Sequence, residues 1–268
     1  MPSRILRRFR LALSAAIFVG MALPSASANP FAKAGKAAAC SSPAGLARLD
    51  QSLVRTSRRM AAGDAITIVA LGSSSTAGAG ATSPDRSYPS RLADELRRRF
   101  PGHAITVLNR GANGEEVEDM VARLDESVLA EKPDLVLWQV GTNAVMRDQD
   151  LVQIGAAIHD GLARIKASGA DVILMDPQFA PQVLAKAEIG PMISLIATLA
   201  NLDQVDLFRR FAVMRSWHDI SGIPFETFVS SDKLHMNDWG YGCIARIFAG
   251  AIAEAASRPV ITAIAARR

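Results

Sequence analysis

Residues 66–78 read ITIVALGSSSTAG, an apolar run that ends in a turn of small and hydroxyl-bearing residues. Ile66 to Leu71 is short, apolar and rich in β-branched side chains, so it predicts a buried strand. Gly72 to Gly78 predicts the loop that follows it. In parallel α/β sheets the working loops lie at the carboxyl ends of the strands, so this stretch indicates that fold class and a candidate site together.

Short apolar runs and amphipathic segments continue to alternate after residue 78. Further strands are predicted at residues 105–108, 135–140, 172–175 and 205–208. Helices are predicted where apolar residues recur at helical spacing: around 92–100, 117–128 and 151–165, from about Pro191, and beyond Asn237. Strands and helices that alternate strictly along the chain predict right-handed crossovers and a parallel sheet covered on both faces.

The segment before the first strand has a different character. Residues 29–45 are rich in Ala, Gly, Ser and Pro and predict a loose leader. Leu46, Leu49 and Leu53 then stand at helical spacing and predict a helix. We therefore expect a leader and amino-terminal helix over residues 29–62, and one catalytic domain over residues 63–268.

Polar residues follow three of the predicted strands, and a fourth group precedes the last helix. These groups are Gly72–Gly78, Asn109–Gly114, Gly141–Asn143 and Asp232–His235. A serine hydroxyl becomes a strong nucleophile when a histidine accepts its proton and a carboxylate holds the imidazole. The candidate catalytic residues are therefore Ser74, His235 and Asp232.

An oxyanion formed by attack on an ester needs fixed N–H donors. The backbone N–H groups of Ser74 and Gly111 and the side chain of Asn143 are the candidate donors. Simpler interpretations remain open at each position. Ser73 and Ser75 are alternative nucleophiles, Gly111 and Asn143 suit ordinary turns, and Asp232 suits a helix start; Ser74 is the preferred nucleophile.

With these four groups the chain resembles the SGNH hydrolases, also known as GDSL esterases and lipases. The family blocks G-D-S-x-[ST], the glycine block, G-x-N and D-x-x-H match, in order, Gly72–Thr76, Gly111 within Asn109–Gly114, Gly141–Asn143 and Asp232–His235. The resemblance implies a three-layer, flavodoxin-like α/β/α fold with a five-stranded parallel sheet, ester hydrolysis or acyl transfer, and no cofactor. Ser73 stands where the family has aspartate, and Ala144 where an acid often follows the asparagine. We interpret both as changes in loop support or pocket lining.

Other enzyme classes lack their motifs in this sequence. There is no G-x-S-x-G nucleophile elbow, no G-x-G-x-x-G and no P-loop. The expected substrate is a small-molecule or saccharide ester. Two alternatives remain: an acyltransferase acting on a sugar hydroxyl, and an exported carbohydrate-binding protein without turnover. Residues 176–190 form a long connection that either covers the site or is a structural excursion.

The first 28 residues predict a signal peptide. Four arginines precede an apolar stretch from Leu11 to Pro24, and Ala26-Ser27-Ala28 suits cleavage after Ala28. The apolar stretch is short of the ~20 residues that cross a bilayer, which disfavours an uncleaved anchor and stable membrane insertion. We expect a periplasmic or secreted protein, with the periplasm preferred.

Removal of residues 1–28 also removes the excess of positive charge. The chain has 30 Lys and Arg against 26 Asp and Glu, and the four arginines of the leader leave 26 of each. The sequence therefore gives no support to nucleic-acid binding. The oligomeric state stays open.

The chain contains two cysteines, Cys40 and Cys243. In an exported protein they are expected to form a disulfide between the leading segment and the last helix, and two buried thiols are the alternative. No metal-ligand spacing such as C-x-x-C or H-E-x-x-H appears, so no metal is expected. His103, His159 and His218 are interpreted as structural or surface residues.

Overall fold

A computed structural model describes residues 39–43 and 45–258 of the 268-residue chain. Its centre is a sheet of five parallel strands in the order β2-β1-β3-β4-β5. The strands are β1 (Ile66–Gly72), β2 (Ile105–Gly111), β3 (Leu135–Gln139), β4 (Asp171–Met175) and β5 (Asp206–Phe208). The predicted parallel α/β fold is confirmed.

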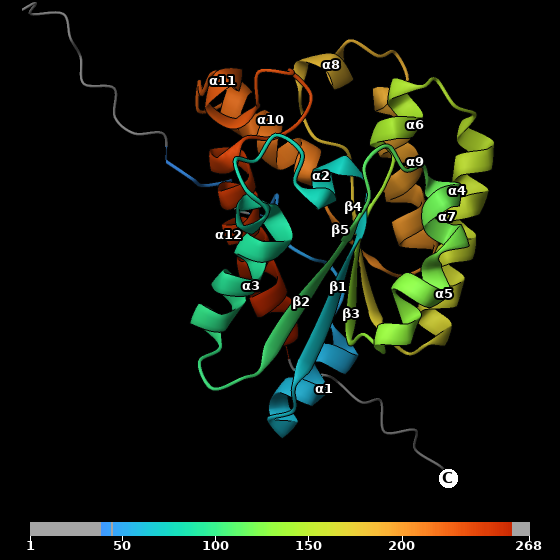
Figure 1. The fold of residues 1–268 in the computed structure, drawn as a ribbon, viewed down its shortest axis with the longest axis vertical. Coiled ribbons are helices and arrows are strands. Elements are labelled where there is room, and N and C mark those ends of the chain that lie inside the picture. The colour runs from blue at the N-terminus through green and yellow to red at the C-terminus, as the bar shows by residue number, and fades with distance from the viewer. Residues whose placement is uncertain (1–38, 44, 259–268) are drawn as a thin grey trace, which may run out of the picture. The chain divides into compact units, whose positions relative to one another are not determined.

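Helices cover both faces of this sheet (Figure 1). One face packs against α1 (Val54–Ala62), α3 (Tyr88–Arg99), α10 (Arg210–Asp219) and α12 (Asp238–Ala256). The other packs against α4 (Val117–Ala122), α5 (Leu124–Ser127), α7 (Leu151–Ala167) and α9 (Ile189–Leu202). The layers are therefore helix, sheet and helix, as the resemblance implied.

Short helices gather toward the carboxyl ends of the strands, at the upper end of the sheet in Figure 1. They are α2 (Ser74–Ala77), α6 (Thr142–Met146), α8 (Pro181–Leu184) and α11 (Phe225–Phe228). The described residues also contain the 3₁₀ helices η1 (Pro84–Arg86) and, before the amino end of β3, η2 (Leu129–Glu131).

Strand β1 shows why its sequence is almost continuously apolar. Ile66, Ile68 and Ala70 belong to the core cluster on the face of α3 and α12, whereas Val69 and Leu71 belong to the cluster on the opposite face. Alternate side chains of a strand point to opposite faces, and here both faces are buried. The strand therefore needs apolar residues at nearly every position.

Several elements differ from the expectation. Strand β2 runs on to Gly111, so residues 109–111 belong to the strand and not to a loop. The apolar stripe of residues 117–128 forms two short helices, α4 and α5, that meet at Arg123. Helix α10 was not predicted, because Arg210 in its first turn and its mixed polar residues weaken the apolar periodicity.

The helix predicted around Leu46, Leu49 and Leu53 is wrong. The first helix of the described chain, α1, begins at Val54, and the preceding residues run along the core as irregular backbone. Leu49 and Leu53 are fully buried. Their spacing reflects contact with the core at successive points, which an irregular segment satisfies as well as a helix does.

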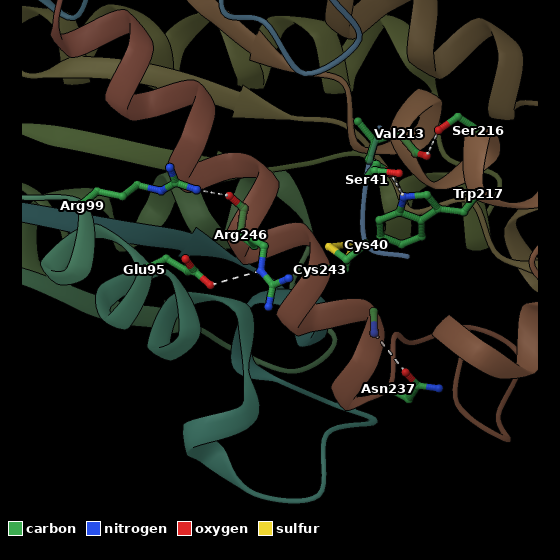
Figure 2. Close-up of a disulfide and its surroundings, with 11 residues drawn as sticks. Cys40, Ser41, Glu95, Arg99, Val213, Ser216, Trp217, Asn237, Cys243 and Arg246 are labelled. Atoms are coloured by element: carbon green, nitrogen blue, oxygen red, sulfur yellow. Dashed lines mark hydrogen bonds and ion pairs between the residues drawn. A yellow bond between two sulfur atoms is a disulfide. The ribbon is translucent and has the colours of Figure 1, made fainter. Parts of the chain in front are cut away.

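This segment is also held by polar contacts, so its described part is not a loose leader. Gln51 N–H donates to Asp206 Oδ1 over 2.8 Å, and Arg258 Nη2 donates to Leu49 O over 2.5 Å. The Trp217 indole donates to Ser41 O over 2.8 Å, and Cys40 is bonded to Cys243 of α12 with a Cα–Cα distance of 5.4 Å (Figure 2). The predicted disulfide is thus present. The predicted signal peptide, residues 1–28, lies outside the described residues.

Candidate active site

Ser74 stands where β1 gives way to helix α2. It is the first residue of that helix, and its backbone N–H points out of the helix start without an intrahelical partner. Gly72 leaves room for the side chain of Thr76, because a Cβ there would lie 2.2 Å from Thr76 Oγ1. The glycine of the first motif is thus required by packing directly beneath the serine.

Ser74, His235 and Asp232 form a continuous hydrogen-bonded chain. Ser74 Oγ lies 2.8 Å from His235 Nε2, and His235 Nδ1 lies 2.6 Å from Asp232 Oδ2. Asp232 accepts the Nδ1 proton, so Nε2 carries the lone pair that faces the serine hydroxyl. The His235 side chain is 16% exposed and that of Asp232 44%. The base is therefore largely screened from water, while its carboxylate partner is not.

A tight turn holds the Asp232 carboxylate in this position. Its Oδ1 accepts hydrogen bonds from Ser230 Oγ (2.6 Å) and from the backbone N–H groups of Leu234 and His235 (both 2.9 Å). Lys233 adopts a left-handed conformation with φ of 60° to close the turn. Partial burial acts to raise the pKa of Asp232, but these hydrogen bonds and that from His235 lower it well below its usual range.

Asn143 reaches the same end of the sheet from α6, which follows β3. Its Nδ2 donates one hydrogen bond to Glu115 O over 2.8 Å, which leaves the second N–H of the amide. Arg147, one turn further along, donates to Gly114 O over 3.0 Å and is paired with Glu116. The loop after β2 is thus tied to α6 beside Asn143.

Gly111, an expected oxyanion donor, lies at the end of β2 in close contact with α2. Its N–H donates to Asn109 Oδ1 over 2.9 Å, so this donor is already engaged. A Cβ at Gly111 would lie 2.1 Å from Ala77 N and 2.6 Å from Thr76 C. Gly111 therefore lets the backbone of α2 pack against β2, and its role as an oxyanion donor stays a prediction.

Gly114 lies three residues further along, at the end of the polar group Asn109–Gly114, and the sequence alone gave it no role. Within residues 39–43 and 45–258, the backbone N–H groups of Ser74 and Gly114 have no protein acceptor. Gly114 has φ of 78°, a left-handed conformation that favours glycine. Gly114 directly precedes Glu115, whose backbone oxygen accepts a hydrogen bond from the Asn143 side chain. Only the structure shows this link between Gly114 and the candidate site.

Ser73, where the family has aspartate, supports the loop. Its backbone N–H and its Oγ both lie 3.1 Å from Gln139 Oε1, and Thr76 Oγ1 donates to the same oxygen over 3.3 Å. Gln139 ends β3 and is buried, and it was not singled out from the sequence. Ala144, the second departure from the family pattern, is buried in the core cluster that contains α7.

The segment after β4 touches the turn of Asp232. Gln182 Nε2 donates to Asp232 O over 2.6 Å, and its N–H donates to Lys233 O over 3.1 Å. A cavity of about 280 Å³ lies beside this turn and is lined by residues that include Pro181, Phe225 and Lys233. Part of the 176–190 segment therefore packs on the histidine loop.

The remaining histidines make structural contacts. His103 Nε2 lies 3.0 Å from Met60 O, His159 Nδ1 2.9 Å from Asp203 Oδ2, and His218 Nδ1 3.1 Å from Ile223 O. No cluster of metal-ligating side chains occurs among the residues that the structure describes. In that same part of the chain, no helix is both long and apolar enough to cross a membrane.

Comparisons with known proteins find one matching family model and curated relatives. The model of the Non-GDSL lipase-like family matches residues 39–258. An acetylxylan esterase of Geobacillus stearothermophilus is 25% identical over 177 residues, 60% of this chain and 78% of that protein. An arylesterase of Vibrio mimicus is 30% identical over 127 residues, 47% of this chain and 62% of that protein.

Among solved structures, a two-domain esterase active on acetylated mannans has a TM-score of 0.68 and 20% identity. The match covers 80% of this chain and 56% of the two-domain chain. At this identity the likeness shows the fold alone, and this chain spans little more than half of that protein.

Proposed function

Because the chain belongs to the Non-GDSL lipase-like family of SGNH/GDSL hydrolases, and its relatives mark it as an ester-hydrolysing enzyme, we propose that it is an exported serine esterase. Ser74 is the nucleophile, His235 the general base and Asp232 the residue that orients and stabilises the imidazole. The hydrogen-bonded chain from Ser74 Oγ to His235 and on to Asp232 carries this proposal.

The first half of the reaction forms an acyl-enzyme. Ser74 Oγ attacks the ester carbonyl carbon as its proton passes to His235 Nε2, and Asp232 stabilises the imidazolium. The C–O bond to the alcohol then breaks, and His235 gives its proton to the departing oxygen. In the second half, water loses a proton to His235 and attacks the acyl carbon. The bond between Ser74 Oγ and the acyl carbon then breaks, His235 returns its proton to Oγ, and the carboxylic acid leaves.

Three N–H donors are available for the negative charge on the carbonyl oxygen. They are the backbone N–H of Ser74, the second amide proton of Asn143 and, in place of the engaged Gly111, the backbone N–H of Gly114. Fixed donors of this kind stabilise the tetrahedral intermediate more than the ground state.

The substrate class that we propose is a short acyl ester, such as an O-acetyl group on a saccharide. Two proteins support it: the acetylxylan esterase relative and the structural neighbour active on acetylated mannans.

The test uses the purified protein and 4-nitrophenyl acetate. Ser74→Ala and His235→Ala should each lower kcat about 10³-fold or more, and Asn143→Ala on the order of 10² to 10³ through the oxyanion. Turnover that survives Ser74→Ala would contradict the assignment of Ser74 as the nucleophile. Acetate released from an O-acetylated xylan or mannan, compared with acetyl transferred to an added sugar, separates hydrolysis from acyl transfer.

Export is proposed from the basic and apolar leader of residues 1–28 and is supported by the disulfide, which persists in oxidising compartments. Protein recovered from the periplasm or medium should begin at Asn29 by mass. A product that keeps Met1 would contradict cleavage.

A further inference from the structure

Gln178 is a buried amide three residues beyond the end of β4. Its side chain is fully enclosed, and its Oε1 accepts from three donors: Arg210 Nη2 at 2.9 Å, Thr142 Oγ1 at 3.0 Å and Ser75 Oγ at 3.2 Å. Its Nε2 donates to Leu234 O over 3.2 Å. One side chain thus bonds to four separate segments of the chain.

Three of these partners are the chain neighbours of the proposed functional residues. Ser75 follows the nucleophile Ser74, Thr142 precedes the oxyanion donor Asn143, and Leu234 precedes the base His235. The three loops come from distant parts of the sequence and meet at Gln178. A shift of this amide would therefore move nucleophile, donor and base relative to one another.

Arg210 determines which way the amide of Gln178 faces. A guanidinium only donates hydrogen bonds and a carbonyl oxygen only accepts them, so Oε1 must face Arg210 and Nε2 must face Leu234 O. Arg210 is itself fully buried in the first turn of α10, and its Nε donates to Asp176 O over 3.0 Å. In the flipped amide, the Gln178 NH₂ group would face the Arg210 N–H donor, and its Oε1 would face Leu234 O.

We infer that Gln178 is a positioning residue that, oriented by Arg210, holds the serine, asparagine and histidine loops in mutual register for the esterase reaction. The inference rests on the proposed function. Gln178 touches no reacting atom in this scheme; it acts through Ser75, Thr142 and Leu234. Small errors in the placement of reacting groups have large effects on rate, because catalysis depends on a near-attack geometry.

The first test replaces Gln178 by methionine, which has similar length but cannot make the four hydrogen bonds. With 4-nitrophenyl acetate, kcat should fall about 10-fold to 100-fold while KM changes about twofold or less, because the loops that carry the reaction move and substrate binding is kept. The rate at which a phosphonate ester labels Ser74 should fall by a similar factor.

Thr56→Val is the matched control. Thr56 is also buried, and its Oγ1 donates to Asp171 Oδ2 over 2.8 Å at the opposite, amino end of β4. This variant should lose stability to urea but keep the wild-type kcat. If Gln178→Met and Thr56→Val both lose stability and both keep kcat, Gln178 is only a structural residue and the inference is wrong.

Smaller changes test the same contacts should Gln178→Met fail to fold. Ser75→Ala and Thr142→Val each remove one partner of Oε1 and should each lower kcat about threefold, within the range of a lost neutral hydrogen bond. Where Gln178→Met does fold, the effect of Ser75→Ala should disappear in the double variant, because coupled residues are not additive. Wild-type kcat in both single variants, or full additivity in the double variant, would overturn the inference.

The two proposals fail in different ways. Absence of both turnover and Ser74 labelling in the wild-type protein would overturn the esterase function, and this inference with it. An active wild type that loses turnover in Ser74→Ala but not in Gln178→Met would overturn this inference alone.

Discussion

Gly111 shows that two different physical requirements can select glycine at the same position. A glycine beside the site suggests a backbone donor, yet the N–H of Gly111 is bonded to Asn109, and the missing Cβ is what α2 requires. Steric exclusion and hydrogen-bond donation both select glycine. Only the positions of neighbouring atoms distinguish them.

Gly111→Ala should therefore impair the site through its geometry. The new Cβ would meet Ala77 N at 2.1 Å, and because the obstacle is backbone, α2 and Ser74 must move. We expect kcat to fall about 10²-fold, in line with a displacement of about 1 Å, together with a lower urea midpoint.

Gly190→Ala is the control for that prediction. A Cβ at Gly190, within α9, would meet nothing within 4 Å, so kcat and stability should stay at or slightly above wild type. Wild-type kcat in Gly111→Ala would show that α2 does not depend on the close contact.

At the scale of elements, the connection between β4 and α10 depends on a buried carboxyl. Asp176 Oδ1 accepts the N–H of Phe211 over 2.8 Å, which satisfies a free donor in the first turn of α10. Burial raises the pKa of Asp176 to about 7, against the lowering effects of the Phe211 N–H and the Arg210 guanidinium.

This pKa predicts a dependence of stability on pH. Between its ordinary value of 3.8 and about 7, the folded state keeps a proton on Asp176 that the unfolded state has lost. The corresponding stabilisation is complete below pH 3.8 and is lost as the pH rises through about 7.

Asp176→Asn should remove this contribution, because asparagine does not titrate and its Oδ1 can still accept from Phe211. In urea unfolding at about pH 4 and about pH 8, the wild type should lose more stability over the interval than the variant does. Equal losses in the two proteins would contradict a raised pKa at Asp176.

At the scale of the molecule, the disulfide joins the described amino-terminal segment to α12 across 203 residues of sequence. Cross-links restrict the unfolded chain, and long loops gain the most, typically about 2–5 kcal/mol. Leu49 and Leu53 bury their side chains in the same core cluster as α12, so the cross-link closes a region that is also packed.

The double variant Cys40→Ala/Cys243→Ala should lower the free energy of unfolding by about 2–5 kcal/mol, measured with urea, and keep most of its kcat. The cysteines lie on the amino-terminal segment and on α12, and neither touches Ser74 or His235. Reductant should destabilise the wild type alone. An equal response of both proteins to reductant would show that the bond does not contribute.

Local pattern by itself determined the five strands, most of the long helices and the four polar groups at their ends. A strand that is buried on both faces needs a continuous apolar run, and a helix that is buried on one face needs apolar residues at helical spacing. Both requirements concern residues that are close together in the sequence. The prediction of Ser74, His235 and Asp232 as catalytic residues also came from local motifs, and the structure brings the three into hydrogen-bonding contact.

Tertiary structure alone decided the features that depend on distant neighbours. The leucines before α1 pack on the core without a helix, Gly111 is required by α2, and Gln178 contacts loops more than 30 residues away in the sequence. A buried glutamine and a close backbone contact leave no periodic trace in a sequence, because their partners come from other segments. The candidate catalytic residues could therefore be predicted from the motifs, whereas the residues that hold them in place could be identified only in the folded chain.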